Sequence, residues 1–236
     1  MKKLIYIALI AAGVFSLNSC ERDTQDTSKV TYYVDMELNG DEIMAWEKGT
    51  PFQDPWVTAT ENGEDVSNNV TVSGSVDADT KGIYFLNYTA VNQDGFPKTI
   101  SRTVVVYDSD AVSLPDMSGT YNVADGSFRL QLSNGAKVAF SGYAVTLAQV
   151  APGIYSVSDY FGGYYEVRAG YGSTYAMRGY CSLEDDNTIT DLYSLVNGWG
   201  DSIDYLDDGI YDPASQTISW KIGYAGAYEW NITLTK

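Results

Sequence analysis

The sequence predicts an all-β protein: a β-sandwich followed by an antiparallel β-barrel or sandwich, both behind an export signal. Of its 236 residues, 20 are tyrosine and 22 are glycine. Stretches that alternate between apolar and polar residues recur along the chain, which is typical of half-buried strands. Turn-forming segments such as NGDE (39–42) separate them, and no helical apolar periodicity stands out after the first twenty residues. The length beyond the signal suits two domains of ordinary size.

The first 19 residues are typical of an export signal, with Lys2 and Lys3 ahead of an apolar stretch at 4–17. The segment LNSC (17–20) resembles a bacterial lipobox, which implies cleavage before Cys20 and a lipid anchor on its thiol. Residues 20–29 are polar and predict a tether. Their acidic residues resemble the export signal of Bacteroides-type lipoproteins, which implies the outer membrane, facing the cell exterior. An ordinary secretory signal with an incidental Cys20 is the alternative.

Composition excludes several classes of function. The chain carries 31 acidic and 14 basic residues, a formal net charge of −17, which disfavours nucleic acid as a partner. It contains no histidine, so histidine-based nucleophile systems and histidine-ligated metal sites are absent. We expect no enzyme, no cofactor and no metal site. Two alternatives stay open: calcium at the acidic stretches 184–187 and 201–208, and glycoside hydrolysis by a carboxylate pair.

The first domain is predicted at residues 30–108, where several stretches alternate between apolar and polar residues. Tyr32, Val34, Met36 and Leu38 alternate on one face, and GIYFLNYTAV (82–91) repeats the pattern. Residues 48–106 resemble a bacterial Ig-like domain first described in a Cry22Aa-type crystal toxin. The resemblance implies a sandwich that serves as a spacer and transfers no catalytic residues. Tryptophan stands at position 56, where the family usually has glycine. The matching positions are Gly49, Phe52, Asp54, Pro55, Val57, Ala59, Asp65, Val66, Gly82, Tyr84, Tyr88, Ala90, Arg102, Val104 and Val106.

Residues 115–236 predict a second β domain. Strands are expected at 144–150 and 154–157 around a Pro-Gly turn, and the chain ends in a strand in which Trp230 faces a core. The stretches SGTY (118–121) and YDPASQTISW (211–220) resemble the C-terminal β domain of uncharacterised Bacteroides surface lipoproteins, some of them encoded near glycan-uptake operons. Cys181 lies in a predicted strand and is expected to be a buried, inert thiol. With Cys20 acylated it has no partner for a disulfide.

The second domain holds 14 of the 20 tyrosines, and the segment SDYFGGYYEVRAGYGSTY (158–175) concentrates them among four glycines. This pattern predicts a long loop or a weakly specified hairpin with some rings in solvent. Exposed rings beside carboxylates and amides are typical of a carbohydrate site. The alternative is that the tyrosines cover a small core with their hydroxyls at the surface. The candidate ligand-binding residues are Tyr160, Phe161, Tyr164, Tyr165, Tyr171, Tyr175 and Trp199.

The resulting hypothesis is a non-catalytic, lipid-anchored surface protein whose second domain binds a polysaccharide or other glycan, with the first domain as a spacer. A protein partner is the other hypothesis: an adhesion or envelope-assembly role, with other outer-membrane proteins as partners, would also use tyrosine and tryptophan at the interface.

Overall fold

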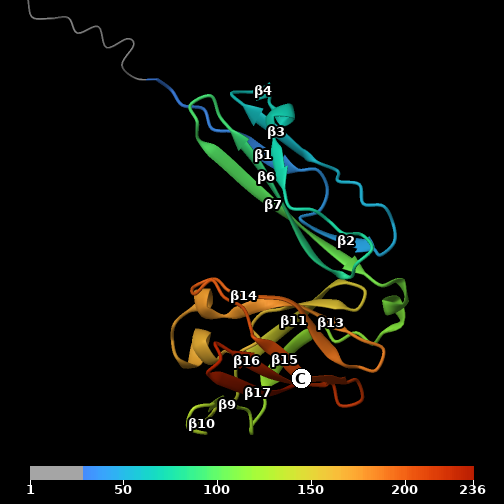
Figure 1. The fold of residues 1–236 in the computed structure, drawn as a ribbon, viewed down its shortest axis with the longest axis vertical. Helices are drawn as coiled ribbons and strands as arrows, with labels where there is room; N and C mark the ends of the chain where they lie inside the picture. The colour runs from blue at the N-terminus through green and yellow to red at the C-terminus, as the bar shows by residue number, and fades with distance from the viewer. Residues whose placement is uncertain (1–28) are drawn as a thin grey trace, which may run out of the picture.

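The computed structural model describes residues 29–236, and the predicted signal, Cys20 and most of the tether lie outside the described residues. The described part is all-β and forms two domains, an elongated one at the top of Figure 1 and a rounder one below it. None of the helices in residues 29–236 is long and apolar enough to cross a membrane.

The first domain is a sandwich of two sheets. One sheet has the order β1-β3-β4 and the other the order β2-β7-β6-β5, in which β2 runs parallel to β7. A short 3-10 helix, η2 (Ser67–Asn69), precedes β5. The strands are β1 (Asp35–Leu38), β2 (Ile43–Glu47), β3 (Val57–Glu61), β4 (Glu64–Asp65), β5 (Thr71–Ser73), β6 (Gly82–Val91) and β7 (Pro97–Tyr107).

Alternation places the core between these sheets. In β6, Leu86, Tyr88 and Ala90 point inward and are buried, as predicted. In the first strand the prediction is right for Val34 and Met36 but wrong for Tyr32, which lies before β1 and is 47% exposed. The alternating buried face therefore begins at Val34, directly before Asp35, the first residue paired with β3.

An ion pair with a fully buried arginine lies in the first domain. Arg102 of β7 has no exposed side-chain surface, and its Nη1 lies 2.6 Å from Asp54 Oδ1. The hydroxyl of Tyr88 donates to the same carboxylate at 2.8 Å, and Arg102 Nη2 donates to the Asn39 carbonyl at 2.7 Å. Burial, followed by the hydrogen bond to Asp54, raises the pKa of Tyr88 well above its usual value. These contacts give physical roles to three positions of the family pattern, because a buried charge is stable only when it is paired and hydrogen-bonded.

The second domain is one large antiparallel sheet that curls around a single core. The path runs β10-β9-β17-β8-β11-β12-β13-β14, and β16 adds to β17 with β15 beside it. The strands are β8 (Gly119–Val123), β9 (Phe128–Gln131), β10 (Lys137–Ala139), β11 (Ala144–Ala151), β12 (Ile154–Val157), β13 (Met177–Leu183), β14 (Ile189–Val196), β15 (Tyr205–Asp212), β16 (Thr217–Tyr224) and β17 (Tyr228–Thr235).

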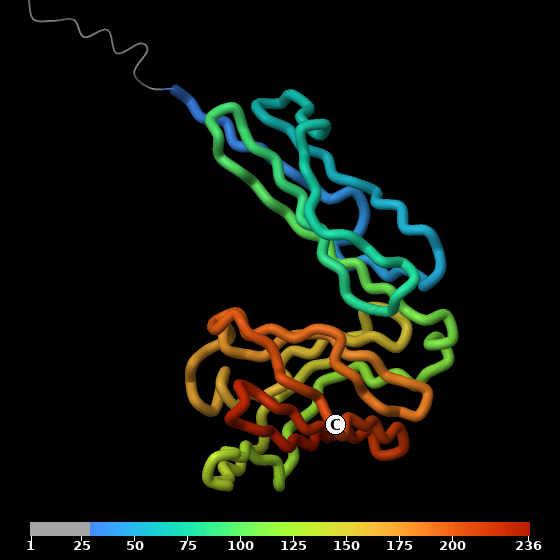
Figure 2. The backbone as a smooth tube through the Cα atoms, in the orientation of Figure 1, coloured from blue at the N-terminus to red at the C-terminus, as the bar shows by residue number. Residues whose placement is uncertain are grey.

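The two ends of the curl meet, so the sheet is close to a barrel. An isolated antiparallel bridge joins Thr188, just before β14, to Ile210 of β15. Strand β17 pairs along its length with β16 and, on its other side, with β9 and then β8. Trp230 and Trp220 are buried inside the curl, as predicted, and so is Cys181, whose pKa burial raises well above its usual value. Figure 2 shows the chain winding around this core.

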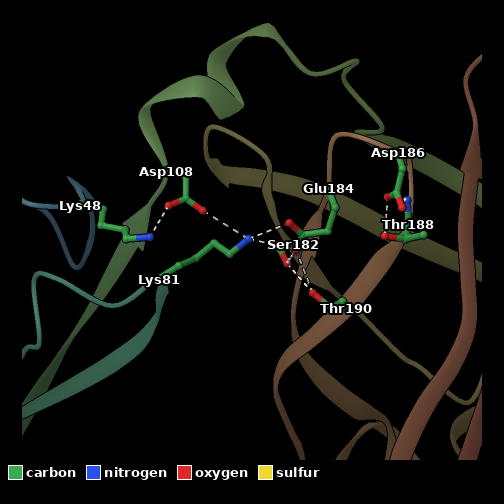
Figure 3. A network of polar contacts seen from close by, with 8 residues as sticks. All are labelled: Lys48, Lys81, Asp108, Ser182, Glu184, Asp186, Thr188 and Thr190. Atoms are coloured by element: carbon green, nitrogen blue, oxygen red, sulfur yellow. Dashed lines mark hydrogen bonds and ion pairs between the residues drawn. The ribbon is translucent and has the colours of Figure 1, made fainter.

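The two domains touch through a small apolar contact and a polar brace. Val105 of β7 packs with Ala151 and Ile154 of the second domain, and the 3-10 helix η3 (Ser109–Ser113) connects the two. Beside this contact, Lys81 Nζ lies 2.9 Å from Glu184 Oε2 and 3.4 Å from Asp108 Oδ2 (Figure 3). The domain junction therefore combines an apolar contact with a network of ion pairs.

Candidate functional site

The predicted aromatic segment does not form a loose loop. After β12 the chain makes tight turns, enters a short π-helical turn η4 (Tyr164–Arg168) and continues to the 3-10 helix η5 (Ser173–Tyr175). Val167 and Arg168 both donate their backbone N–H to the Gly163 carbonyl at 3.0 Å. Single π-helical turns of this kind are rare in proteins, and many of those that occur lie at functional sites.

Asp159 organises this segment from inside the protein. Its Oδ1 accepts the backbone N–H groups of Phe161 and Met177 at 2.9 Å, and its Oδ2 accepts that of Gly163 at 2.9 Å. Burial raises the pKa of Asp159 to about 7, although the three hydrogen bonds oppose this rise. Because Asp159 is buried, it does not contribute to a polar rim around a ligand.

The two glycines after Phe161 turn the rings inward. Gly162 and Gly163 have φ angles of +65° and +76°, a conformation that favours glycine. A Cβ atom on Gly163 would also lie 2.8 Å from Tyr143 Cβ. The glycine pair is therefore required for close packing of the backbone against core side chains and is no sign of a mobile loop.

Four of the predicted ligand-binding rings are part of the core, which corrects the prediction for Tyr160, Phe161, Tyr164 and Tyr165. Tyr160 and Phe161 have no exposed surface, and Tyr164 and Tyr165 are 5% and 8% exposed. Phe161 packs at 4.5 Å, centroid to centroid, from Trp230. The chain at Tyr164 and Tyr165 is π-helical and not extended, and the centroids of these adjacent rings are 5.3 Å apart.

The other three predicted residues lie together at the surface. Tyr171 is 55% exposed, Trp199 is 41% exposed, and Tyr175 is half-buried between them. The ring centroids of Tyr175 and Trp199 are 4.9 Å apart, and those of Tyr171 and Tyr175 are 5.5 Å apart. We call Tyr171, Tyr175 and Trp199 the aromatic shelf. The structure thus brings together residues that are up to 28 positions apart in the chain.

The shelf stands on buried aromatic residues and on a tight turn. Tyr165 contacts Trp199 edge to face at 4.8 Å and Tyr171 in a stacked arrangement at 5.7 Å. The Trp199 turn is closed by the Gly200 N–H, which donates to the Val196 carbonyl at 2.7 Å. Such support limits the rotamers of the exposed rings, so little side-chain freedom remains to be lost on binding a ligand.

Charged residues occur in the segments that carry the shelf. Asp201 accepts the Tyr224 hydroxyl at 2.8 Å, and burial followed by this hydrogen bond raises the pKa of Tyr224 well above its usual value. The Arg168 guanidinium lies 5.0 Å from the centre of the Tyr164 ring, and the half-buried Glu166 belongs to the same helical turn. The acidic stretches are engaged by the protein itself: Glu184 binds Lys81, and Asp208 lies 2.7 Å from Lys221. Among residues 29–236, no group of three or more acidic or cysteine side chains has a metal-binding arrangement.

Sequence reasoning missed a second feature, a cleft of about 420 Å³ on the outer face of the second domain. Phe85 of the first domain forms one wall, and Tyr180, Tyr193 and Arg178 are among the residues of the second domain that line it. Alternation along β13 and β14 predicts that these side chains point outward. They line a cleft only because the first domain packs beside them.

Comparison with known proteins identifies the family. A family model for a C-terminal domain matches residues 110–236, more than half of the chain, and a model described as a bacterial surface protein Ig-like domain matches residues 36–106. The lipoprotein BT2262 from Bacteroides thetaiotaomicron, known from a crystal structure, is 47% identical over 86% of this chain and 100% of its own, with a TM-score of 0.49. The chain belongs to the BT2262 lipoprotein family. The Ig-like fold of the first domain, expected from the pattern at 48–106, is thereby confirmed.

More distant solved structures resemble the chain weakly. A Clostridium perfringens ZmpB structure that contains the module CBM51-2 in complex with GlcNAc is 16% identical, covering 53% of this chain and 29% of that chain, with a TM-score of 0.29. A Bacteroides ovatus protein of unknown function is 10% identical, covering 89% of this chain and 82% of that chain, with a TM-score of 0.30. At this level of superposition, nothing about a ligand of the present chain follows from either. No curated protein matches the chain.

Proposed function

We propose that this protein is a non-catalytic surface lipoprotein that binds a glycan on the aromatic shelf of its second domain. The observation that carries the proposal is the placement of Tyr171, Tyr175 and Trp199 in one exposed cluster on a buried aromatic base. Sugar rings present C–H faces that pack on aromatic rings, and their hydroxyls are bound by carboxylates and amides at the edge. Asp201 is exposed two residues after Trp199, and its carboxylate can accept from sugar hydroxyls in addition to the Tyr224 hydroxyl.

The buried aromatic residues beneath the shelf favour a ligand-binding role for the shelf over a role in covering the core. Phe161, Trp230 and Tyr165 already fill the interior beneath the shelf, so Tyr171 and Trp199 are not needed to close it. Large exposed rings that are fixed in place are typical of recognition surfaces. Stacking on two or three rings would provide most of the affinity, and the polar edge would provide selectivity.

The architecture supports a spacer role for the Ig-like domain. The first described residues lie at the end of that domain farthest from the second domain (Figure 1). With the predicted lipid on Cys20 in the outer membrane, the Ig-like domain would hold the shelf away from the membrane, toward the cell exterior. The absence of histidine from the whole chain, and family matches to surface domains, support a role without catalysis.

Affinity electrophoresis of residues 21–236 in gels that contain soluble polysaccharides tests this function. We expect retardation by at least one polysaccharide, and its loss in Trp199→Ala and Tyr171→Ala. Tyr33→Ala is the matched control, because Tyr33 is 67% exposed but lies in the Ig-like domain. Retardation that survives both shelf substitutions would contradict the proposal.

The result also separates the glycan from a protein partner. If no polysaccharide of a broad panel retards the wild-type protein, while intact cells or envelope proteins bind it in a Trp199-dependent way, the shelf is a protein-binding surface instead. A circular dichroism spectrum that matches wild type is required of each variant. Trp199 is 41% exposed and packs on Tyr165 and Tyr175, so we expect Trp199→Ala to destabilise the second domain by about 1–3 kcal/mol, and Tyr171→Ala, at the more exposed ring, to cost less.

A further inference from the structure

We propose that the cleft between the two domains is a second binding site, separate from the aromatic shelf, and that it takes a carboxylate-bearing sugar of the hexuronate type. The cleft has a volume of about 420 Å³, and small-molecule sites commonly fall in the range of about 300–1,000 Å³ and lie at domain interfaces. Its lining is mainly apolar, with a few polar groups that converge on it.

Strand register forms the floor of the cleft. Ser156 of β12 is paired with Tyr180 of β13, and Tyr180 is paired with Tyr193 of β14. Paired residues lie side by side on the same face of a sheet, so these three side chains form one row. Their inward neighbours Val157 and Ser194 are buried, which places the row on the outer face of the curl.

The Ig-like domain closes one side. The ring of Phe85 in β6 meets Tyr193 edge to face at a centroid distance of 4.9 Å, and Tyr193 lies 6.4 Å from Tyr180. All three rings are half-buried, so each keeps part of its surface toward the cleft. They offer apolar surface for the C–H face of a sugar ring.

Arg178 supplies the charge that selects an acidic ligand. In a protein of net charge −17, its exposed guanidinium has no carboxylate partner, hydrogen bond or aromatic contact among residues 29–236. By contrast, Arg102 is paired with Asp54, and Arg129 and Arg168 lie over tyrosine rings. Arginine binds carboxylates through two parallel hydrogen bonds, which makes an unengaged arginine in an aromatic cleft suited to a carboxylate.

Other polar groups fit the hydroxyls of the same ligand. The amide of Asn197 lines the cleft and has no hydrogen bond within the described residues. Ser158 Oγ accepts the Thr146 N–H at 2.9 Å, which leaves its own proton free to donate. Burial raises the pKa of Tyr180, although a hydrogen bond with Thr103 opposes this rise. Because Arg178 is the cation among the residues that line the cleft, the ligand carboxylate is placed beside Arg178.

Titration calorimetry of residues 21–236 with galacturonate and glucuronate, as free sugars and as short oligomers, tests this site. Galactose and glucose are the neutral counterparts. We expect the acidic sugars to bind at least tenfold more tightly than the neutral ones, and more weakly as salt is raised, since the ion pair is partly exposed. Tighter binding of oligomers than of free sugars identifies a polysaccharide as the source of the ligand, and equal binding identifies the free sugar.

Arg178→Gln should reduce the affinity for the acidic sugar at least tenfold and remove its preference over the neutral one. Lys98→Gln is the control, because Lys98 is another exposed cation with no ion-pair partner within the described part of the chain, but it lies in the Ig-like domain and does not line the cleft. Asn197→Ala provides a second variant, expected to weaken acidic and neutral sugars alike. Unchanged binding of the acidic sugar by Arg178→Gln, or no binding at millimolar concentrations by the wild type, overturns the proposal.

The two sites are distinguishable. Trp199→Ala should leave hexuronate binding unchanged if the cleft is the site. If Trp199→Ala abolishes that binding and Arg178→Gln does not, the acidic sugar sits on the aromatic shelf, and the cleft proposal fails while the proposed function stands.

Discussion

Arg102 Nη1 lies 2.6 Å from Asp54 Oδ1 in the Ig-like sandwich, and Arg102 has no exposed side-chain surface. The pair joins β7 to Asp54, which lies just before β3. Strands β7 and β3 belong to different sheets. A contact of this kind links the two layers by charge where the rest of the core links them by apolar packing.

We expect Arg102→Met to destabilise the Ig-like domain by about 3 kcal/mol or more. The substitution keeps most of the apolar stem but removes the cation that balances the Asp54 carboxylate, which keeps only the Tyr88 hydroxyl and the Trp56 N–H as donors, and it removes a donor to the Asn39 carbonyl. Removing one partner of a buried pair commonly costs about 3–5 kcal/mol. Urea denaturation followed by tryptophan fluorescence measures the loss. Lys98→Met, at an exposed position, is the control. A loss below about 1 kcal/mol would show that the pair is structurally dispensable.

Gly163→Ala should lower the thermal stability of the second domain more than Gly170→Ala does. Both glycines have similar positive φ angles, +76° and +72°, so the backbone strain of an alanine is comparable at the two positions. Only at Gly163 would the new Cβ collide with a neighbour, Tyr143 at 2.8 Å, because nothing lies within 4 Å at Gly170. We expect about 1 kcal/mol from strain at each and a further 1–3 kcal/mol at Gly163. Equal melting temperatures for the two variants would refute the tight fit.

The pH dependence of stability should report Asp159. Burial raises its pKa to about 7 in the folded protein from an ordinary value of 3.8, so the folded state holds a proton that the unfolded state has already released. The contribution of Asp159 to stability is therefore fully present below pH 4 and declines as pH rises to about 7. The stability difference between wild type and Asp159→Asn should shrink between pH 5 and pH 8 in urea titrations. A difference that grows with pH would mean that the three backbone hydrogen bonds outweigh burial.

The polar brace at the domain junction should contribute little to stability. Lys81, Asp108 and Glu184 are each about one quarter to one third exposed, and such pairs contribute about 0–1 kcal/mol. We expect Lys81→Ala to lower either melting transition by no more than about 5 °C, whereas Ile154→Asp, in the apolar contact, should loosen the domains. Small-angle scattering measures this as an increased radius of gyration. Equal scattering by Ile154→Asp and wild type would show that the apolar contact does not hold the domains together.

The fold was largely predictable because strand alternation is a local signal. The hairpin of β11 and β12, the final strand β17 and the inward positions of Trp220 and Trp230 follow from neighbouring residues alone. Trp56 is instructive in another way. Its φ is +66°, which explains why glycine is usual at this position in the family. The ring of Trp56 packs edge to face on Tyr88 at 5.7 Å, and this contact offsets the strain.

The site was only partly predictable, for two physical reasons. Glycine pairs occur both in mobile loops and at close approaches, and the sequence does not show that Tyr143 lies against Gly163. Tyrosine is amphipathic, so its burial depends on what packs over it; Tyr160 is fully buried while Tyr171, in the same segment, is 55% exposed. The domain cleft was not predictable at all, because Phe85 and Tyr193 meet only after both domains have folded.

The buried Cys181 has a practical consequence. Without Cys20, the chain has no other cysteine, and burial keeps this thiol protonated in the native state. A maleimide dye should therefore not react with the folded protein and should label Cys181 only when the β13 region opens. The rate of labelling then measures the rate or extent of that opening. A cysteine engineered at any surface position would carry a fluorophore with almost no background labelling.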